Sequence, residues 1–144
     1  MGEIFDGDSG HDPGVGKGLM ELGLGGLVVP ERFGGAGLEV IDLALATETL
    51  AYGGAPGPFF AHSLAALAIS HGGSESQRER WLPKLASGEW LGTVALGNDN
   101  GSWDGDPGAT SPSMENGSLS GVKTFSPFAR SADLLVVGTA GEGL

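Results

Sequence analysis

The stretch from Arg80 to Leu96, RWLPKLASGEWLGTVAL, constrains the fold most, because the hydrophobic pattern changes inside it. Before Ser87 the apolar residues recur at near-helical spacing. Gly88 suits the position just past a helix end, where a left-handed backbone carries no penalty for a Cβ atom. After Gly88 the run WLGTVAL is short, apolar and bounded by turn residues, which favours a buried strand over 90–96. The sequence therefore predicts helices before Gly88 and strands after it.

Two helices are predicted well upstream of this junction. The first covers 39–53, ends at Gly53-Gly54, and has one apolar face at i, i+3, i+4 and i+7 spacing. That face consists of Val40, Leu43, Ala44, Thr47, Leu50 and Ala51. The second helix opens after Pro56 and Pro58, whose missing N–H groups are harmless in a first turn, and Gly72-Gly73 stops it. The face predicted for this second helix consists of Phe60, Leu64, Leu67 and His71.

A third helix leads directly into the junction. Ser74-x-x-Gln77 has the spacing of a capping box, in which each residue satisfies the backbone N–H of the other. Pro83 lacks an N–H, so we expect it to break the helix after Trp81 and to leave a last turn that ends at Ala86. The bulky aromatic residues on either side of the junction are expected in the core. They are Phe59, Phe60, Trp81 and Trp90.

The part of the chain after the junction predicts a small sheet. A long polar loop is expected over 97–116, followed by strands near 118–125 and 133–139. Three strands cannot close a barrel, and such a sheet keeps exposed edges unless more chain or a partner covers them. We interpret this part either as the truncated start of a β-domain or as an edge that a partner completes.

Composition and charge exclude several classes of function. The chain has 144 residues, 18 acidic and 7 basic side chains, and a net charge of −11, which argues against nucleic acid and against an anionic membrane surface. No apolar run approaches the ~20 residues of a membrane span. The acidic, Gly-rich beginning is not typical of a signal peptide, so a cytoplasmic protein is the default expectation. Cysteine is absent, and His11, His62 and His71 lack metal-ligand spacing, so no metal site is predicted.

Three stretches carry motif-like spacing that composition does not explain. They are LMELGLGGLVVPERFGGAGLEVIDLALATETLAYGG, then WLPKLASGEWLGTVAL, and finally GVKTF followed by ADLLVV. Together they resemble the acyl-CoA dehydrogenase family over about residues 19–139. The segment APGPFF also resembles the helix start of members that act on steroid or other bulky acyl-CoA substrates.

The resemblance implies an α+β chain with a defined division. A flexible tail would cover 1–18, a helical N-terminal domain 19–88, and the first strands of an antiparallel β-domain 89–144. The family's C-terminal helical domain, which carries the catalytic Glu, would be absent, so no residue of this chain is assigned as catalytic.

The resemblance also implies a reaction and its participants. In the family a carboxylate removes the α-proton of an acyl-CoA thioester while the β-hydrogen leaves as hydride to FAD. The partners implied are the acyl-CoA substrate, an electron-acceptor flavoprotein, and another acyl-CoA dehydrogenase chain in a homo- or hetero-oligomer. The chemistry implied is that of an oxidoreductase of lipid or steroid catabolism.

The family's flavin contacts map onto two short segments here, and both depart from the pattern. The family's "L-T-E-P-x-x-G-S-D" becomes LGNDNGSWD, where Gly97 replaces the Thr after Leu96 and Gly101-Ser102 matches with a one-residue gap. The family's "W-I-T" becomes Phe125-Ser126-Pro127. Phe125 can still stack on a ring, whereas Pro127 offers neither a hydroxyl nor an N–H. The candidate cofactor-binding residues are Leu96, Gly97, Gly101, Ser102, Phe125 and Pro127.

These departures leave several interpretations open. The chain could be the flavin-deficient subunit of a heteromeric enzyme, a dehydrogenase chain whose site tolerates the changes, or a truncated chain. A stand-alone ligand-binding module is a third class of function, which an apolar pocket between helices and strands would support. Trp103 is open between covering a flavin or acyl pocket, contacting a partner, and anchoring a loop, and Lys123 could be a solvated strand residue.

Overall fold

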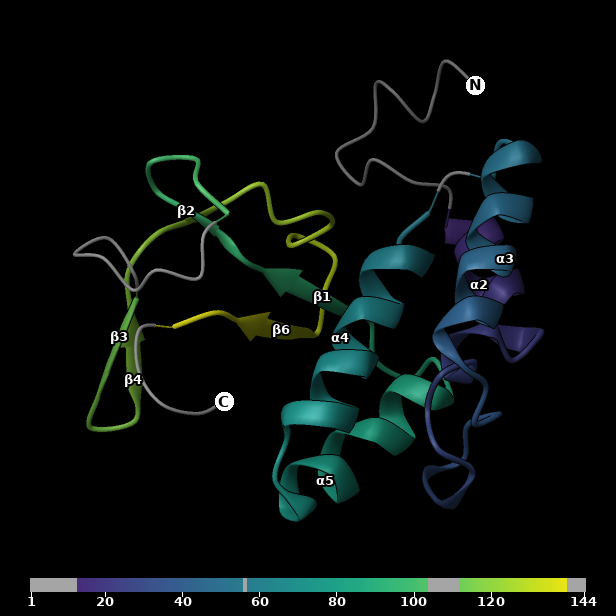
Figure 1. Cartoon of the computed structure of the whole chain (residues 1–144), viewed down its shortest axis with the longest axis horizontal. Helices are drawn as coiled ribbons and strands as arrows, with labels where there is room; N and C mark the ends of the chain where they lie inside the picture. The colour runs from purple at the N-terminus through teal and green to yellow at the C-terminus, as the bar shows by residue number, and fades with distance from the viewer. Residues whose placement is uncertain (1–12, 56, 104–111, 140–144) are drawn as a thin grey trace.

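The computed structural model describes residues 13–55, 57–103 and 112–139, and it has the α+β organisation that the junction predicts. The helices are α2 (Pro13–Glu21), α3 (Val40–Tyr52), α4 (Phe59–Gly72) and α5 (Glu75–Ala86), with short 3-10 turns η1 (Leu24–Gly26) and η2 (Glu31–Phe33). The strands are β1 (Gly92–Ala95), β2 (Gly97–Asn98), β3 (Ser113–Glu115), β4 (Ser118–Ser120), β5 (Lys123–Thr124) and β6 (Leu134–Val137). Figure 1 shows the helices on one side of the molecule and the strands on the other.

The change of structure at the junction is confirmed at residue level. Gly88 follows the C-cap residue Ser87 of α5 and has φ +72°, in the left-handed region that glycine tolerates. The N–H of Gly88 donates to the Leu85 carbonyl at 3.1 Å, and the N–H of Trp90 donates to the Lys84 carbonyl at 3.1 Å. These bonds satisfy the last carbonyls of α5 and turn the chain toward β1.

Pro83 does not break α5, which corrects the sequence expectation. The helix continues through Pro83 to Ala86, and the predicted capping box at its start is present, with Gln77 N–H donating to Ser74 Oγ at 3.3 Å. Pro83 is exposed, and the carbonyl that loses its helical partner belongs to Glu79, also an exposed residue. Water can satisfy that carbonyl, so the buried inner face of α5 keeps the helix intact.

The face predicted for α4 is wrong at two of its four positions, since Leu64 and Leu67 are half-buried and Leu67 packs against the core. Phe60 is 52% exposed and His71 is exposed, whereas the buried positions lie around the rest of the helix. They are Phe59, Ala61, His62, Ser63, Ala65, Ala66 and Ile69. Helices, turns and β1 surround α4, so it is buried over most of its circumference and its sequence has weak helical periodicity.

The helix α2 begins earlier than expected, and α3 buries less of its apolar face than expected. Residues 13–18, expected in the tail, belong to α2, whose Leu19 is buried and whose Val15 contacts the core. Residues 1–12 and Pro56 lie outside the described residues. On α3 only Leu43 of the predicted apolar face is fully buried, while Val40 is 57% exposed. The α3 helix contacts the remaining helices along a narrower strip than its sequence pattern indicates.

The strands form three separate pairs and not one sheet. β1 pairs with β6 in parallel, with Gly92 opposite Leu134 and Ala95 opposite Val137. The antiparallel arrangement expected from the sequence is present in β2–β5 and in the hairpin β3–β4. The strand predicted over 118–125 is interrupted at Gly121, so that β4 and β5 have different partners. The polar loop predicted over 97–116 contains β2 and β3.

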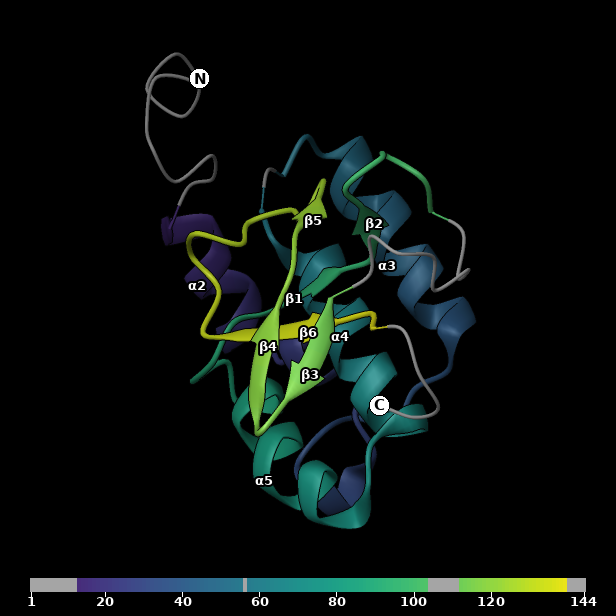
Figure 2. The same ribbon diagram turned by 90° about the vertical axis from the view of Figure 1, so that its left-hand side faces the viewer.

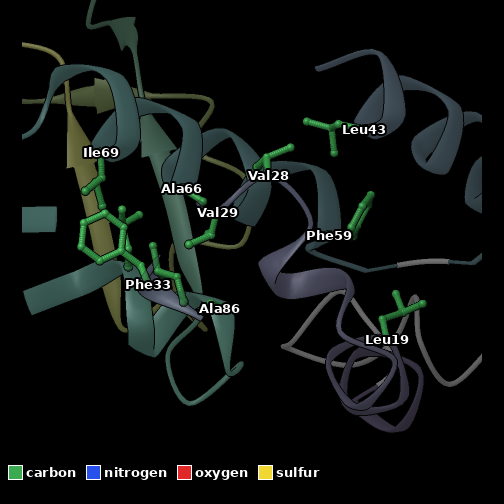
Figure 3. Packing of buried hydrophobic residues seen from close by; sticks show 11 residues of the cluster. Leu19, Val28, Val29, Phe33, Leu43, Phe59, Ala66, Ile69 and Ala86 are labelled. Carbon is green, nitrogen blue, oxygen red and sulfur yellow. The ribbon is translucent and has the colours of Figure 1, made fainter. Parts of the chain in front are cut away.

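The core lies among the helices and reaches β1 and β6 from one side. Its cluster of buried side chains comes entirely from residues before the junction, and Figure 3 shows them converging from several helices and turns. Leu134 and Val136 of β6 contact this cluster. Figure 2, together with Figure 1, shows β1 and β6 lying between the hairpin β3–β4 and α4. The expected core aromatics Phe59, Trp81 and Trp90 all contact or enter the cluster.

Candidate functional site

The candidate cofactor-binding residues come from two segments that the pair β2–β5 holds together. Gly97 lies opposite Thr124, and Asn98 lies opposite Lys123. This pairing places the segment after Leu96 beside the segment that ends at Phe125, although they are far apart in the sequence. The tertiary structure therefore brings together two motifs that the sequence indicates separately.

Asn98 organises the turn that follows β2. Its N–H donates to the Ser102 carbonyl at 2.9 Å, and its own carbonyl accepts from the Gly101 N–H at 2.8 Å and from Thr124 Oγ1 at 2.7 Å. Gly101 has φ +79°, which explains glycine at that position. The candidate residues Gly101 and Ser102 are thus held against β2 by backbone hydrogen bonds. Sequence reasoning did not single out Asn98 or Thr124, because neither stands in a position where the family resemblance assigns a role.

Lys123 is an internal contact of this site. Its Nζ donates to Asn98 Oδ1 at 2.8 Å and to the Leu96 carbonyl at 3.2 Å. Asn98 is 4% exposed, so the ammonium group is directed at a buried amide. Lys123 is therefore not simply a solvated strand residue. Its ammonium group forms hydrogen bonds that hold β2 to β5.

Gly97 has no space for a side chain. A Cβ atom at this position would lie 2.7 Å from the Thr124 carbonyl oxygen and 3.2 Å from Thr124 Oγ1. The first of these contacts is with backbone, so it could be relieved only by moving the strand pair. The strands β2 and β5 therefore lie too close together at this point to accommodate a threonine at position 97.

The aromatic rings of this site stack on each other. The Phe125 and Trp103 ring centroids are 6.4 Å apart with an interplanar angle of 18°. Both rings are largely exposed, at 70% for Phe125 and 63% for Trp103, and Leu96 is 46% exposed. Phe125 has φ +53°, which is uncommon for a bulky residue. Trp103 is thus the partner of Phe125, and the two form an exposed aromatic pair.

Pro127 is held by the other strand pair. Its carbonyl accepts a hydrogen bond from Thr93 Oγ1 at 2.6 Å, and Thr93 in β1 is fully buried. The Pro127 ring itself is exposed. This contact fixes the backbone at 127 but supplies no donor to a ligand, because proline has no N–H.

The described residues do not fit a flavin ring held as the family resemblance implies. By the family resemblance, such a ring would contact threonine hydroxyls at 97 and 127 and an aromatic surface at 125. Gly97 has no hydroxyl and no room for one, and Pro127 has no donor. Phe125 already stacks with Trp103 at a centroid separation of 6.4 Å. We therefore derive no reaction step through a flavin in this chain.

Other kinds of site are absent within the part of the chain that the structure describes. Among residues 13–55, 57–103 and 112–139 no group of three or more metal-ligating side chains could hold a metal ion. Over the same ranges, no helix has the length and apolar character needed to cross a bilayer. His62 and His71 both lie on α4, but His62 is fully buried whereas His71 is exposed.

Comparison with known proteins identifies the family. Residues 5–89 match the family model "Acyl-CoA dehydrogenase, N-terminal domain", which covers more than half of the chain. The chain therefore belongs to the acyl-CoA dehydrogenase family, as the three sequence stretches indicated. A probable acyl-CoA dehydrogenase of Bacillus subtilis is 38% identical over 124 residues, which cover 81% of this chain and 21% of that protein. The chain spans only 15% to 21% of the length of the first curated relatives that it matches.

Solved structures show the same similarity in three dimensions. A steroid ACAD, Tcur3481-Tcur3483, superposes with a TM-score of 0.82 at 30% identity, over 96% of this chain and 38% of that chain. An acyl-CoA dehydrogenase of Bacillus anthracis, complexed with FAD, superposes with a TM-score of 0.67 at 33% identity, over 86% of this chain and 24% of that chain. The helical layer and the first strands thus have the arrangement found in this family of oxidoreductases.

Proposed function

We propose that this chain serves the FAD-dependent α,β-dehydrogenation of an acyl-CoA thioester as the partner of a second, flavin-bearing acyl-CoA dehydrogenase chain. The observation that carries the proposal is the close approach of Gly97 to Thr124, which leaves no room for a flavin-contacting side chain. Pro127 and the Phe125–Trp103 stack support it from the other segment. In this proposal the chain supplies a helical layer and strand edge to the assembly, and the partner supplies the flavin and the catalytic base.

The relatives support a proposal for the substrate class. The solved structure with a TM-score of 0.82 is named as a steroid ACAD and as a pair, Tcur3481-Tcur3483. The APGPFF segment at the start of α4 points in the same direction. We therefore propose a bulky, steroid-like acyl-CoA as the substrate of the complete enzyme.

A visible absorption spectrum tests the flavin part of this proposal. The purified, desalted chain is expected to be colourless, and titration with FAD is expected to show no saturable binding. Trp103→Ala uncovers Phe125, and Pro127→Thr restores a hydroxyl at an exposed position. FAD binding is still expected to be undetectable in both variants, because neither changes the close approach of Gly97 to Thr124. Flavin bands that survive desalting would show that this chain holds FAD itself and would overturn the partner assignment.

Co-expression tests the partner part. A flavin-bearing acyl-CoA dehydrogenase chain from the same organism is expected to co-elute with this chain as a yellow complex. Two chains that elute separately, each with unchanged flavin content, contradict the proposal.

A hollow between the helices and the strands favours a second candidate function, that of a ligand-binding module. It has a volume of about 260 Å³, lies between α4, α5 and β6, and the hairpin β3–β4 closes part of it. Apolar side chains line it, including Ile69, Trp81, Met114, Leu119 and Val136. Because Trp81 lines the hollow, saturable quenching of tryptophan fluorescence by a straight-chain fatty acid would favour this function, and no change would exclude it.

A further inference from the structure

His62 is a fully buried imidazole at the point where the helices meet β1. It lies on α4 with 0% exposure. Its Nε2 is 3.2 Å from the Gly25 carbonyl oxygen and 3.2 Å from the Leu85 carbonyl oxygen. Its Nδ1 accepts a hydrogen bond from the Gly92 N–H at 3.1 Å. One side chain therefore connects η1, the end of α5 and the first residue of β1.

These partners fix the protonation state of the ring. Gly92 presents an N–H, so Nδ1 must carry a lone pair and no proton. Both neighbours of Nε2 are carbonyl oxygens, which only accept, so Nε2 must carry the proton. The neutral Nε2–H tautomer satisfies all three contacts. A second proton could be placed only on Nδ1, where it would face the Gly92 N–H and destroy that hydrogen bond.

We propose that His62 is an acid-sensitive clasp that holds β1 to the helical layer only while its imidazole is neutral. This inference goes beyond the proposed function and does not depend on it. Protonation would break the side-chain hydrogen bond that ties Gly92 to α4. Because β1 leads directly to Leu96 and Gly97, release of its first residue would loosen the segment that carries the candidate site. His62 is thus a positioning residue for that segment.

Few charged groups could offset a charge on His62. The elements packed against it, η1 and β1, contain no ionisable side chain, and on α5 the charge nearest Leu85 is Lys84, 3.7 Å from Glu89. The other titratable group at this junction is Asp133, whose Oδ2 accepts from the Leu91 N–H at 2.9 Å. Burial lowers the pKa of His62, and the hydrogen bonds to Gly25 and Leu85 oppose this effect only in part.

The sign of the pH dependence follows. An unfolded histidine takes up its proton below about pH 6.5, whereas folded His62 does so only at lower pH. The stabilisation from neutral His62 is therefore complete above about pH 6.5 and is lost as the pH falls from there toward the lower pKa of the folded state. Over the window between the two pKa values, the unfolding equilibrium constant is expected to rise by up to about tenfold per pH unit from this residue.

The first test uses the unmodified chain and NMR of isotope-labelled imidazole nitrogens. His62 is expected in the Nε2–H tautomer, and to stay neutral at pH values where an unfolded histidine is already charged. As the ring finally takes a proton, the amide of Gly92 is expected to lose about tenfold of its protection against hydrogen exchange. An Nδ1–H tautomer, or a Gly92 amide whose protection ignores the titration, would overturn the clasp.

Matched variants give the second test through denaturation midpoints measured across pH. His62→Gln keeps a donor for the two carbonyls but cannot titrate, so the acid-dependent loss of stability is expected to disappear between neutral pH and about pH 5. His71→Gln replaces the exposed histidine of the same helix, and this variant is expected to lose stability in acid as the unmodified chain does. Asp133→Asn removes the neighbouring carboxylate and so separates its contribution to the pH dependence. This variant is also expected to lose stability in acid. If His62→Gln retains the wild-type pH profile, the proposal is wrong; if that variant does not fold, the NMR test decides alone.

Discussion

The helices and the strands downstream of Gly88 differ in how much of the buried core they form, although both regions leave large apolar side chains exposed. In α5, Leu82 and Leu85 are completely buried, and the cluster around them comes only from residues before the junction. In the strand region, Met114 is 70% exposed and Leu119 is 42% exposed. The helical layer thus has its own core, whereas every residue of the hairpin β3–β4 is exposed. Exposed apolar side chains occur in both regions, with Ile41 of α3 at 65% and Met114 of β3 at 70%, and such groups are typical of surfaces that another structure covers.

The same contrast exists in how each region is held together. The helical layer combines a capped helix, a buried cluster and the His62 contacts. The pair β2–β5 has two paired positions and relies on Lys123, Asn98 and Thr124 for its remaining contacts. The candidate site therefore depends on a few polar contacts to keep its shape.

Replacing one leucine in each region gives the largest expected difference. Leu82→Ala removes a side chain with 0% exposure and leaves a cavity, so we expect a loss of about 3 kcal/mol in the free energy of unfolding. Leu119→Ala, in the exposed hairpin, is expected to cost about 0.5 kcal/mol or less. Denaturant unfolding followed by circular dichroism measures both. Equal losses for the two variants would show that the hairpin belongs to the same core and would remove the contrast.

A smaller effect is expected from filling the space at Gly97. The new Cβ of Gly97→Ala would meet the Thr124 carbonyl oxygen, so we expect a loss of about 1–3 kcal/mol. Gly57→Ala is the matched control, because a Cβ there meets nothing within 4 Å. That control is expected to change stability by less than about 0.5 kcal/mol. If the two variants are equally stable, the strand pair yields easily, and a flavin-contacting side chain at 97 would no longer be excluded.

The smallest expected change concerns the start of α5. Ser74→Ala removes the acceptor for the Gln77 N–H and is expected to cost about 1 kcal/mol. Glu79→Ala, at an exposed position within the same helix, is expected to change the free energy of unfolding by less than about 0.5 kcal/mol. Thermal unfolding of the two variants side by side measures the difference. A cap variant as stable as its control would show that burial, and not capping, holds the helical layer together.

The sequence predicted those features that depend on neighbouring residues. The capping box at Ser74, the left-handed Gly88 after α5 and the change from helices to strands are all local, and the structure contains each of them. Family membership was also evident, because motif spacing is a property of the chain itself. The candidate residues at 97, 101, 102, 125 and 127 came from that spacing, and their role in binding a flavin stays a proposal.

Other features depend on contacts between distant residues, and only the tertiary structure decided them. α4 is surrounded on most sides, so no single face of its sequence marked the core, and the exposed Phe60 was expected inside. Pro83 could remain in α5 because the side of the helix that lost a hydrogen bond faces water. The contact between Gly97 and Thr124, the stack of Trp103 on Phe125 and the three partners of His62 each join segments more than twenty residues apart. Local pattern specifies helices and turns through short-range hydrogen bonds, but the approach of two backbones is set by the packing of the whole chain.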